Sequence, residues 1–478
     1  MAMPNLERQF KQGVRWSMIG SVGGTLFQFL QMLVFARLAG PEDAGDYALA
    51  ATCIGVLTPM AEAGLSQAVV SSRALNSRQF GALFRINFGI CLAAIAGLFL
   101  MGSSIADWYE RPVLAGLLPS MGLALLFTPF GAQYGALLSR DLRFDDAAKI
   151  QVGSGGAGFL LVAFLAWKGW GPWAMAWGFV ARSALAALGC WWVARDVFSF
   201  RWMESCSWKE LRPLLRFGLF DLSARWADFL ANWLDKLIVG KWLGAAALGF
   251  YNLAFTIGTI PTARIGYVVT RVSFPLFAKA GDDLDLREQI FQKTTRNVVL
   301  ILYPAYLTMA LFAEELVLLL YGTAWQPAVP LLQAFGAAGL IRTLAAGFPQ
   351  LTRGIGKPQW ALLWLLLWAA AANAVLAVCL SIDPAPETAA WSRVGAKLLL
   401  EIPLLAWLAQ RCGVSFGGLL QHAWRYLIWL SPLSLAVYIA GEWLTDFWQG
   451  LFVKTLIWAA GLSWALWRGP LKNVKRMN

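Results

Sequence analysis

Charge, histidine and cysteine are scarce in this chain of 478 residues. Only 14% of the residues are charged and 59% are hydrophobic, whereas about 25% of the residues in soluble domains are charged. The composition therefore excludes an ordinary water-soluble domain. The one histidine, His422, and the six scattered cysteines form no Cys-x-x-Cys pair and no His/Cys cluster. Neither a metal site, a catalytic triad nor a disulfide framework is predicted.

Long apolar segments dominate the chain instead. About fourteen stretches avoid charged side chains over roughly 18 to 25 residues, and about 20 apolar residues suffice for an α-helix to cross a bilayer. We therefore predict an all-α polytopic membrane protein with about fourteen transmembrane helices. The predicted spans are residues 15–37, 44–70, 81–103, 112–138, 150–167, 171–194, 216–240, 246–270, 297–320, 328–352, 359–381, 389–410, 423–441 and 446–467.

Basic residues set the predicted orientation. Most of the 39 lysines and arginines fall in loops on the side of the N-terminus, and such an excess marks the cytoplasmic side. An even number of spans then places both termini in the cytoplasm. Because the basic residues are dispersed over many short loops, nucleic acid is not a predicted partner. The loops on the other side leave no room for a catalytic domain, so we do not expect an enzyme.

One segment of the sequence occurs twice. "RLAGPEDAGDYALA" (residues 37–50) aligns without gaps with "KWLGAAALGFYNLA" (residues 241–254). The matched pairs include Gly40 with Gly244, Gly45 with Gly249 and Tyr47 with Tyr251. After a gap of two residues, Pro59 matches Pro261 and Glu62 matches Arg264. Six predicted spans separate the copies, and this even number gives both copies the same orientation.

The repeat defines the predicted domain organisation. Copies with one orientation indicate two lobes related by an axis along the membrane normal, as in transporters built from parallel repeats. We predict six-helix lobes over residues 1–211 and 212–411 around a central cavity, and two extra helices over residues 412–478. Pro59 and Pro261 lie in repeat-related spans, where a proline kinks a helix. We interpret them as hinges, with irregular helix packing as the alternative.

Polar residues follow one face of the seventh predicted span. They are Asp221, Arg225, Asp228, Asn232 and Asp235, and their counterparts in the first span are Ser17, Ser21, Gly24, Gln28 and Gln31. A charge at mid-membrane costs about 2.5 to 3.5 kcal/mol when it faces lipid. We therefore predict that both stripes face the water-filled cavity, with Asp221, Asp228, Asn232, Ser21, Gln28 and Glu62 as its polar or coupling residues. For Asp235 and Lys236, the alternative to a position in the cavity is a position at the membrane–water interface.

Basic residues inside the spans are candidate anion ligands. They are Arg182, Arg225, Arg264 and Arg342. A guanidinium group suits phosphate because it donates two parallel hydrogen bonds, and Asp221 or Asp228 would tune Arg225 or carry a coupling proton. The alternative is that Arg225 and Asp228, three residues apart, neutralise each other. Lys397 and Glu401, one turn apart, are predicted to form a structural ion pair.

The segment "GSGGAG" (residues 153–158) fits the dinucleotide-binding pattern G-x-G-x-x-G literally. No predicted strand precedes it, and it opens an apolar run. We therefore interpret these glycines as a site where membrane helices pack closely.

Four segments near the ends of spans carry a family resemblance. They are "ARLAGPEDAGDYALA" (residues 36–50), "EAGLSQAVVSSR" (62–73), "ALLSRDLRF" (136–144) and "ELVLLLYGTAWQPAVPLLQ" (315–333). These motifs resemble the polysaccharide transporter branch, of Wzx type, of the multidrug/oligosaccharidyl-lipid/polysaccharide flippase superfamily. The resemblance extends over about residues 10–410.

The resemblance implies a function as well as a fold. It implies a bacterial inner-membrane flippase that moves undecaprenyl-pyrophosphate-linked oligosaccharide units by alternating access, for exopolysaccharide, capsule or O-antigen synthesis. The implied partners are that substrate, membrane lipids, a polysaccharide polymerase and a chain-length regulator. No cofactor is implied, and a coupling ion, H⁺ or Na⁺, is left open. Arg225, Arg264 and Arg342 take the role of cavity bases, and the spans in residues 412–478 that of a groove for the lipid tail.

Two other functions stay open at this point. A cation-coupled multidrug exporter would use Asp221 and Asp228 as ion sites. A membrane polymerase or ligase of lipid-linked sugars would need a sizeable catalytic loop outside the membrane, which the predicted topology lacks.

Overall fold

The computed structural model describes residues 3–62, 66, 69, 76–195, 206–281, 283–443 and 447–468. These residues form helices joined by short turns, and no strand occurs among them, as predicted for an all-α protein. The chain divides into two compact units, Met1–Gly249 and Phe250–Asn478. This division follows packing and not the sequence repeat, so the lobe boundaries at residues 211 and 411 stay a prediction.

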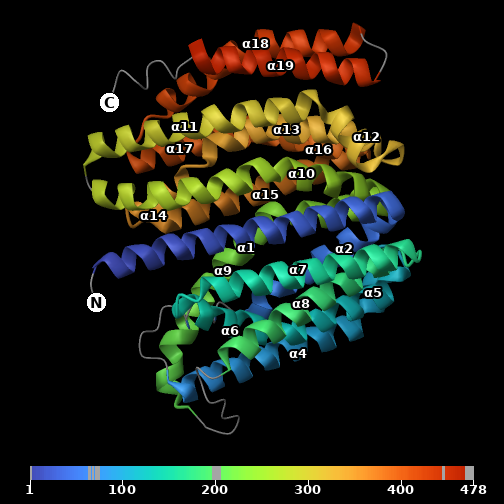
Figure 1. Ribbon diagram of the computed structural model, residues 1–478, viewed down its shortest axis with the longest axis vertical. Helices are drawn as coiled ribbons and strands as arrows, with labels where there is room; N and C mark the ends of the chain where they lie inside the picture. Colours follow the sequence, from blue (N-terminus) through green and yellow to red (C-terminus); the bar gives the residue numbers. More distant parts are fainter. Residues whose placement is uncertain are drawn as a thin grey trace. The chain divides into compact units, whose positions relative to one another are not determined.

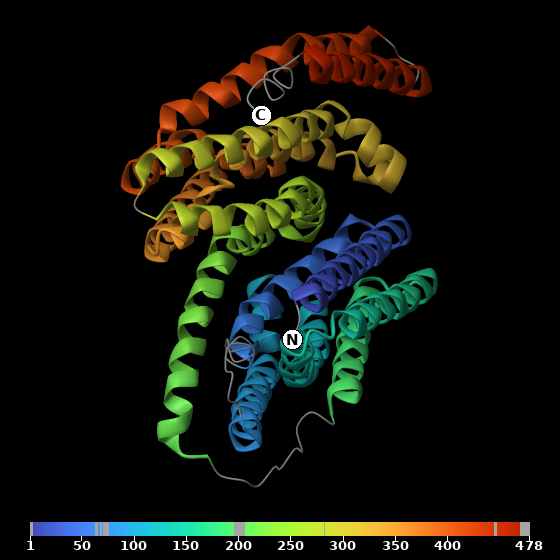
Figure 2. The same cartoon turned by 60° about the vertical axis from the view of Figure 1, so that its left-hand side comes forward.

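The first unit is a bundle of helices (Figure 1). Its elements are α1 (Met3–Leu38), α2 (Pro41–Glu62), α4 (Ser77–Trp108), α5 (Val113–Gly122), η1 (Leu123–Phe127), α6 (Thr128–Arg140), α7 (Phe144–Trp167), α8 (Pro172–Ala194), α9 (Trp208–Asn232) and the start of α10 (Leu234–Ala280). Helix α4 begins with a capping box, in which Asn76 and Gln79 satisfy each other's backbone N–H groups. Helix α1 packs along α7, and α9 packs against α2 and α4; α9 is the long helix at the left of Figure 2.

The second unit continues from α10 with a further set of helices. They are α11 (Leu284–Leu311), α12 (Ala313–Tyr321), η2 (Thr323–Trp325), α13 (Ala328–Ala345), α14 (Phe348–Gly354), α15 (Pro358–Ile382), α16 (Pro386–Ala396), η3 (Lys397–Glu401), α17 (Ile402–Cys412), α18 (Phe416–Trp443) and α19 (Phe447–Arg468). Prolines lie at the first or second position of α14, α15, α16 and α17. Proline is tolerated there because the N–H groups of the first turn have no acceptor within the helix. Helices α18 and α19 pack side by side (Figure 1).

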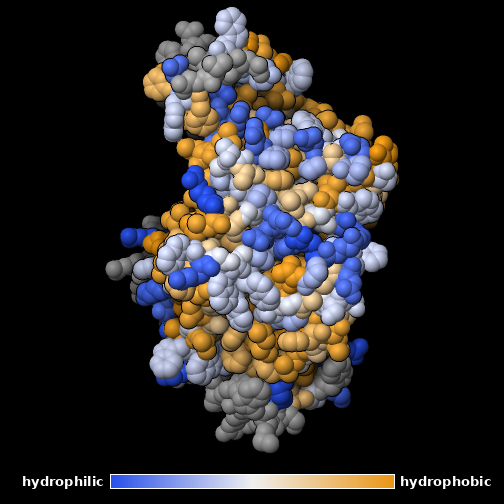
Figure 3. All heavy atoms as spheres, turned by 90° about the vertical axis from the view of Figure 1, so that its right-hand side faces the viewer, coloured by the Kyte–Doolittle hydropathy of each residue, from blue (hydrophilic) through white to orange (hydrophobic). Residues whose placement is uncertain are grey.

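Many of these helices are long and apolar enough to cross a membrane. In the described residues nine helices meet that condition, or ten if α11 and α12, bent by 68°, count as one broken span. Large apolar side chains lie on the surface, among them Leu100 at 82% exposure and Leu399 at 75%, and apolar side chains cover much of the face in Figure 3. The protein is therefore a multi-pass membrane protein. The predicted count of fourteen is not confirmed.

The sequence repeat has a structural counterpart. Gly40 separates α1 from α2, and its repeat partner Gly244, at φ 80° and ψ −178°, interrupts α10 at the equivalent point. A Cβ atom on Gly45 would lie 1.7 Å from the carbonyl oxygen of Ala245, and one on Gly249 would lie 2.1 Å from that of Pro41. Each glycine thus contacts the first residue of the other repeat's helix, so the contact has local two-fold symmetry.

Replacing Gly249 with alanine is expected to destabilise this contact, because the new methyl group would collide with the backbone of Pro41. Overpacking of this kind costs about 1–3 kcal/mol. Thermal unfolding in detergent, followed by tryptophan fluorescence, should show a lower midpoint. Gly153→Ala in α7 is the matched control, since a Cβ atom there meets nothing within 4 Å and alanine favours a helix. Equal midpoints for the two variants would contradict the prediction.

Candidate functional site

Arg225, the basic residue of the predicted polar stripe, forms an ion pair that joins α9 to α2. Arg225 Nη1 donates to Glu62 Oε2 at 2.8 Å, with the two side chains 36% and 28% exposed. The residues are 163 positions apart in sequence, so periodicity within one helix gives no sign of the pair. The predicted cavity residues Arg225 and Glu62 are therefore brought together, in contact with each other.

The other residues of the stripe are placed differently from one another. Asp228 is exposed and accepts a hydrogen bond from Asn232 Nδ2 at 3.0 Å. The side chain of Asp221 lies outside the described residues. Asp235 and Lys236 are each only 1% exposed, which excludes an exposed interfacial position for these two side chains. The helix breaks at Trp233, and the Lys236 ammonium group stacks on its ring at 3.8 Å from the centroid.

The corresponding stripe of the first span is split between two faces of α1. Ser21 and Gln28 are exposed, whereas Gln31 is buried and donates to the sulfur of Met175 in α8. Gly24 is also buried, and a Cβ atom there would lie 3.0 Å from the Gln151 side chain of α7. The prediction of one continuous hydrophilic face on α1 is therefore wrong, because α7 and α8 cover part of it. Ser21 and Gln28 keep the exposure that it required.

Three further arginines were predicted as anion ligands: Arg182, Arg264 and Arg342. Arg182 in α8 and Arg342 in α13 are half-buried, and neither forms an ion pair with any carboxylate in the part of the chain that the structure describes. Arg182 lies within electrostatic range of Tyr47, and Arg342 of Tyr306 and Lys397. The side chain of Arg264 lies outside the described residues.

The predicted structural pair of Lys397 and Glu401 is confirmed. Lys397 Nζ donates to Glu401 Oε2 at 2.5 Å, and the two residues are 7% and 2% exposed. They occupy the ends of η3, a turn of π-helix. The Lys397 ammonium group also lies 4.3 Å from the ring centroid of Trp368 in α15. The hydrogen bond between the two charges and the aromatic neighbour of Lys397 reduce the cost of burying them.

The prolines and glycines singled out in the sequence lie in helices. Pro59 lies inside α2 and Pro261 inside α10, and their role as hinges stays a prediction. The interpretation of residues 153–158 as a packing motif is confirmed, because Gly155 and Gly156 contact Phe27 of α1. Gly158 likewise contacts α8.

An ion-pair network at one end of the first unit was not anticipated from the sequence. Arg111, between α4 and α5, donates to both carboxylate oxygens of Asp46 at 2.9 and 2.7 Å and to Glu42 at 2.6 Å. Hydrogen bonds with Asp46 raise the pKa of Arg111. Burial, together with the charges of Asp46 and Glu42, raises the pKa of Asp43. The acids of the motif "GPEDAGD" therefore serve structure, at the N-terminal end of α2 where the helix dipole favours them.

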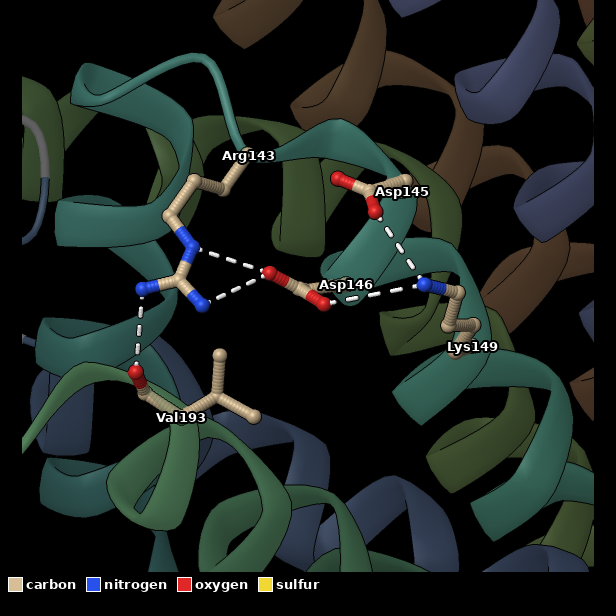
Figure 4. Close-up of polar contacts among 5 residues, drawn as sticks. All are labelled: Arg143, Asp145, Asp146, Lys149 and Val193. Carbon is tan, nitrogen blue, oxygen red and sulfur yellow. Dashed lines mark hydrogen bonds and ion pairs between the residues drawn. The ribbon is translucent and has the colours of Figure 1, made fainter.

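A second network joins α6, α7 and α8 at the segment "SRDLRFDDAAK" (residues 139–149). Arg143 Nε donates to Asp146 at 2.8 Å, and its Nη1 donates to the carbonyl oxygen of Val193 at 3.0 Å (Figure 4). Lys149 reaches Asp145 at 3.1 Å and Asp146 at 3.8 Å. The charges of this motif thus hold the α6–α7 turn against the end of α8. Among the described residues, no group of His, Cys, Asp or Glu side chains is placed to hold a metal ion.

Comparison with known proteins connects this arrangement to a family. The family model described as "Polysaccharide biosynthesis protein" matches residues 34–330. The chain is 28% identical over 342 residues to the lipopolysaccharide biosynthesis protein WzxC of Escherichia coli (strain K12), covering 71% of the chain and 69% of WzxC. It is 25% identical over 366 residues to the succinoglycan biosynthesis transport protein ExoT of Rhizobium meliloti (strain 1021), covering 77% of the chain and 73% of ExoT.

The fold also has a counterpart among solved structures. The lipid II flippase MurJ in an inward closed conformation superposes with a TM-score of 0.76 over 95% of this chain and 99% of that chain. The sequences are 12% identical, so the likeness is one of fold alone.

Proposed function

Because the chain belongs to the polysaccharide biosynthesis protein family, we propose that it translocates lipid-linked oligosaccharide units across a membrane. The cargo we propose is an undecaprenyl-pyrophosphate-linked repeat unit, moved from the cytoplasmic to the outer leaflet of the bacterial inner membrane for exopolysaccharide, capsule or O-antigen synthesis. The similarity to ExoT, named as a transport protein, and the fold shared with MurJ support transport over catalysis.

One observation carries the proposal at the level of residues. Arg182 and Arg342 lie in helices that are long and apolar enough to span a membrane, and no carboxylate of the described chain forms an ion pair with either. A base in such a helix costs about 2.5 to 3.5 kcal/mol if it faces lipid. A flippase for a pyrophosphate lipid gives these bases a purpose, because its cargo carries anionic oxygens through the membrane.

Three glutamates are already paired with bases and so do not support the alternative of a cation-coupled drug exporter. Glu62 pairs with Arg225, Glu401 with Lys397 and Glu315 with Lys454. An exporter that binds cations needs carboxylates available to its cargo. Asp228, whose side chain is exposed, keeps this alternative open. A membrane polymerase or ligase has no observation in its favour.

The rest of the proposal concerns topology, partners and energy. We propose that both termini are cytoplasmic, that the protein is not an enzyme and holds no resident cofactor, and that H⁺ or Na⁺ couples transport. A polysaccharide polymerase and a chain-length regulator are the proposed partners. The direct test is a strain lacking the gene, in which lipid-linked repeat units should accumulate in the cytoplasmic leaflet and surface polysaccharide should disappear. Normal surface polysaccharide in that strain would overturn the proposal.

Replacing Arg182 with glutamine should lower the rate of polysaccharide export without lowering the amount of inserted protein. A hydrogen bond to a charged group contributes about 1.5–3 kcal/mol, so we expect roughly a tenfold loss of rate or more. Export is measured in the deletion strain complemented with each variant. Arg195→Gln is the matched control, because Arg195 is exposed just beyond the same helix and stacks on Trp192. Equal export by both variants would remove Arg182 from the cargo path.

A further inference from the structure

Helices α11 and α18 of the second unit pack along each other in a parallel register. Near their beginnings, Gln292 Nε2 donates to the carbonyl oxygen of Ser415 at 3.1 Å, and a Cβ atom on Gly418 would lie 2.5 Å from the same nitrogen. Near their far ends, Phe312 and Val437 belong to one apolar cluster. Position 292 therefore lies opposite 418 and position 312 opposite 437, so the offset between the two helices stays nearly constant.

This register brings an arginine of α11 opposite the one histidine of the chain. Arg296 lies four residues beyond Gln292, and His422 lies four residues beyond Gly418. Four residues advance each helix by about one turn and return to the same face, so the two residues lie opposite each other as well. Arg425, three residues after His422, lies on the same side of α18. Both arginines are within electrostatic range of His422.

The positive charges at this junction have no carboxylate partner in the part of the chain that the structure describes. Neither Arg296 nor Arg425 forms an ion pair there. The nearer of the two acids of α11 is Glu288, whose carboxylate already accepts hydrogen bonds from the Gln292 side chain and from the Ser415 N–H group, each at 2.7 Å. The one acid of α18 lies in its last turn. The junction is therefore a basic site open to an anion.

An exposed apolar strip of α18 runs beside the bases. Leu420, Trp424 and Ile428 are four residues apart, and all three are exposed, Trp424 at 66%. Because α18 is long and apolar enough to cross a membrane, this strip faces the lipid chains. The predicted spans begin at residues 297 and 423, directly after Arg296 and His422. The bases therefore lie where both helices enter the bilayer, at the level of the lipid head groups.

We propose that Arg296, His422 and Arg425 bind the phosphate group of an anionic membrane phospholipid, whose acyl chains lie along the exposed strip of α18. Guanidinium groups suit any phosphate, but the adjoining apolar strip selects an amphipathic ligand. Basic pockets between transmembrane helices on the cytoplasmic side bind lipid head groups in this way, and the predicted orientation places the beginnings of α11 and α18 on that side. The site goes beyond the proposed function, because its ligand is a lipid of the surrounding bilayer and not the cargo.

The test measures the unfolding midpoint of the purified full-length protein in detergent micelles that contain increasing mole fractions of phosphatidylglycerol. A lipid that binds only the folded protein raises the midpoint, and the mole fraction at half of the rise reports its affinity. Arg425→Gln should increase this mole fraction roughly fivefold, and Arg425→Gln with Arg296→Gln roughly thirtyfold, the equivalent of about 1 kcal/mol for each base beside an anionic lipid. Arg411→Gln is the matched control, since Arg411 is an exposed base at the end of α17 that stacks on Trp407.

The one histidine of the chain gives a second readout from the site itself. In protein labelled with ¹⁵N at histidine alone and freed of its purification tag, the ring signals of His422 should shift when phosphatidylglycerol is added. Phosphatidylcholine, whose head group has no net charge, should shift them little. Equal responses to the two lipids would overturn the proposal, and so would a double arginine variant that responds to phosphatidylglycerol as Arg411→Gln does. The midpoint of the double variant without lipid shows whether it is folded.

A competition arm distinguishes a phospholipid from other sources of phosphate. Inorganic phosphate should not reproduce the shift of the His422 ring, and an equimolar polyprenyl diphosphate should not displace phosphatidylglycerol. If inorganic phosphate gave the same shift, or if the diphosphate displaced the phospholipid at lower concentration, the assignment to a phospholipid would be wrong. The proposed function is tested separately by the deletion strain, whose export defect does not depend on lipid binding at this junction.

Discussion

Replacing Arg111 with glutamine is expected to destabilise the first unit by about 3 kcal/mol. The Asp46 side chain is 4% exposed and takes both of its close hydrogen bonds from this guanidinium group. Glutamine leaves the carboxylate buried without its counter-charge, and breaking a buried pair in this way costs about 3–5 kcal/mol. Arg111 itself is 28% exposed, which places the effect at the low end. Thermal unfolding in detergent should show the midpoint fall by about 6–12 °C.

Two further variants separate the buried pair from the exposed one. Glu42→Gln should change the midpoint little, because Glu42 is 63% exposed and surface ion pairs contribute about 0–1 kcal/mol. The double variant Arg111→Gln with Asp46→Asn should recover most of the loss, since no charge is left buried alone. If the unfolding midpoint of Arg111→Gln is as high as that of Glu42→Gln, the buried carboxylate of Asp46 does not need Arg111 as its counter-charge.

Replacing Lys454 with methionine is expected to disrupt the attachment of α19 to α12. Lys454 Nζ donates to Glu315 at 2.6 Å, with the side chains 14% and 7% exposed. Phe312, Val437 and Trp458 form an apolar cluster. Leu316 of α12 and Leu451 of α19 pack against this cluster. Methionine keeps the apolar stem but leaves Glu315 with an uncompensated charge, at a cost of about 3–5 kcal/mol. Both the unfolding midpoint and polysaccharide export should fall.

The control for Lys454 exchanges the two charges. Lys454→Glu combined with Glu315→Lys restores opposite charges at the same two positions, and it should recover more stability than either single variant. The neutral pair Lys454→Met with Glu315→Gln should also recover stability, because a buried ion pair is often no more stabilising than apolar groups of similar volume. Export that stays normal in Lys454→Met would show that the last two helices work without this anchor.

Regularities along the chain were sufficient to predict the membrane class and the repeat. Apolar runs about 20 residues long indicate helices that cross a membrane. In lipid the backbone N–H and C=O groups of such a run must form their hydrogen bonds within the helix. The pairing of Gly45 with Gly249 was visible as a sequence match and became a two-fold backbone contact. Lys397 and Glu401 were predictable for a similar reason, because both partners lie on one turn of one helix.

Partners from different helices could not be predicted in this way. Spacing along α9 offered Asp228, three residues on, as one partner for Arg225, but it gave no sign of the ion pair that Arg225 forms with Glu62 of another helix. The register of α1 predicted a hydrophilic face, yet α7 and α8 cover Gly24 and Gln31. Helical periodicity tells which residues share a face, and it says nothing of what the neighbouring helix brings to that face.

The sequence by itself therefore determined that this is an all-helical membrane protein with an internal repeat and bases inside its spans. Only the tertiary structure decided which of those bases are neutralised and which are not. Arg225, Lys397 and Lys454 each have a carboxylate partner, whereas Arg342 has none among the described residues. The physical reason is that the cost of a buried charge depends on distances of a few ångströms between side chains, and those distances are set by how helices pack.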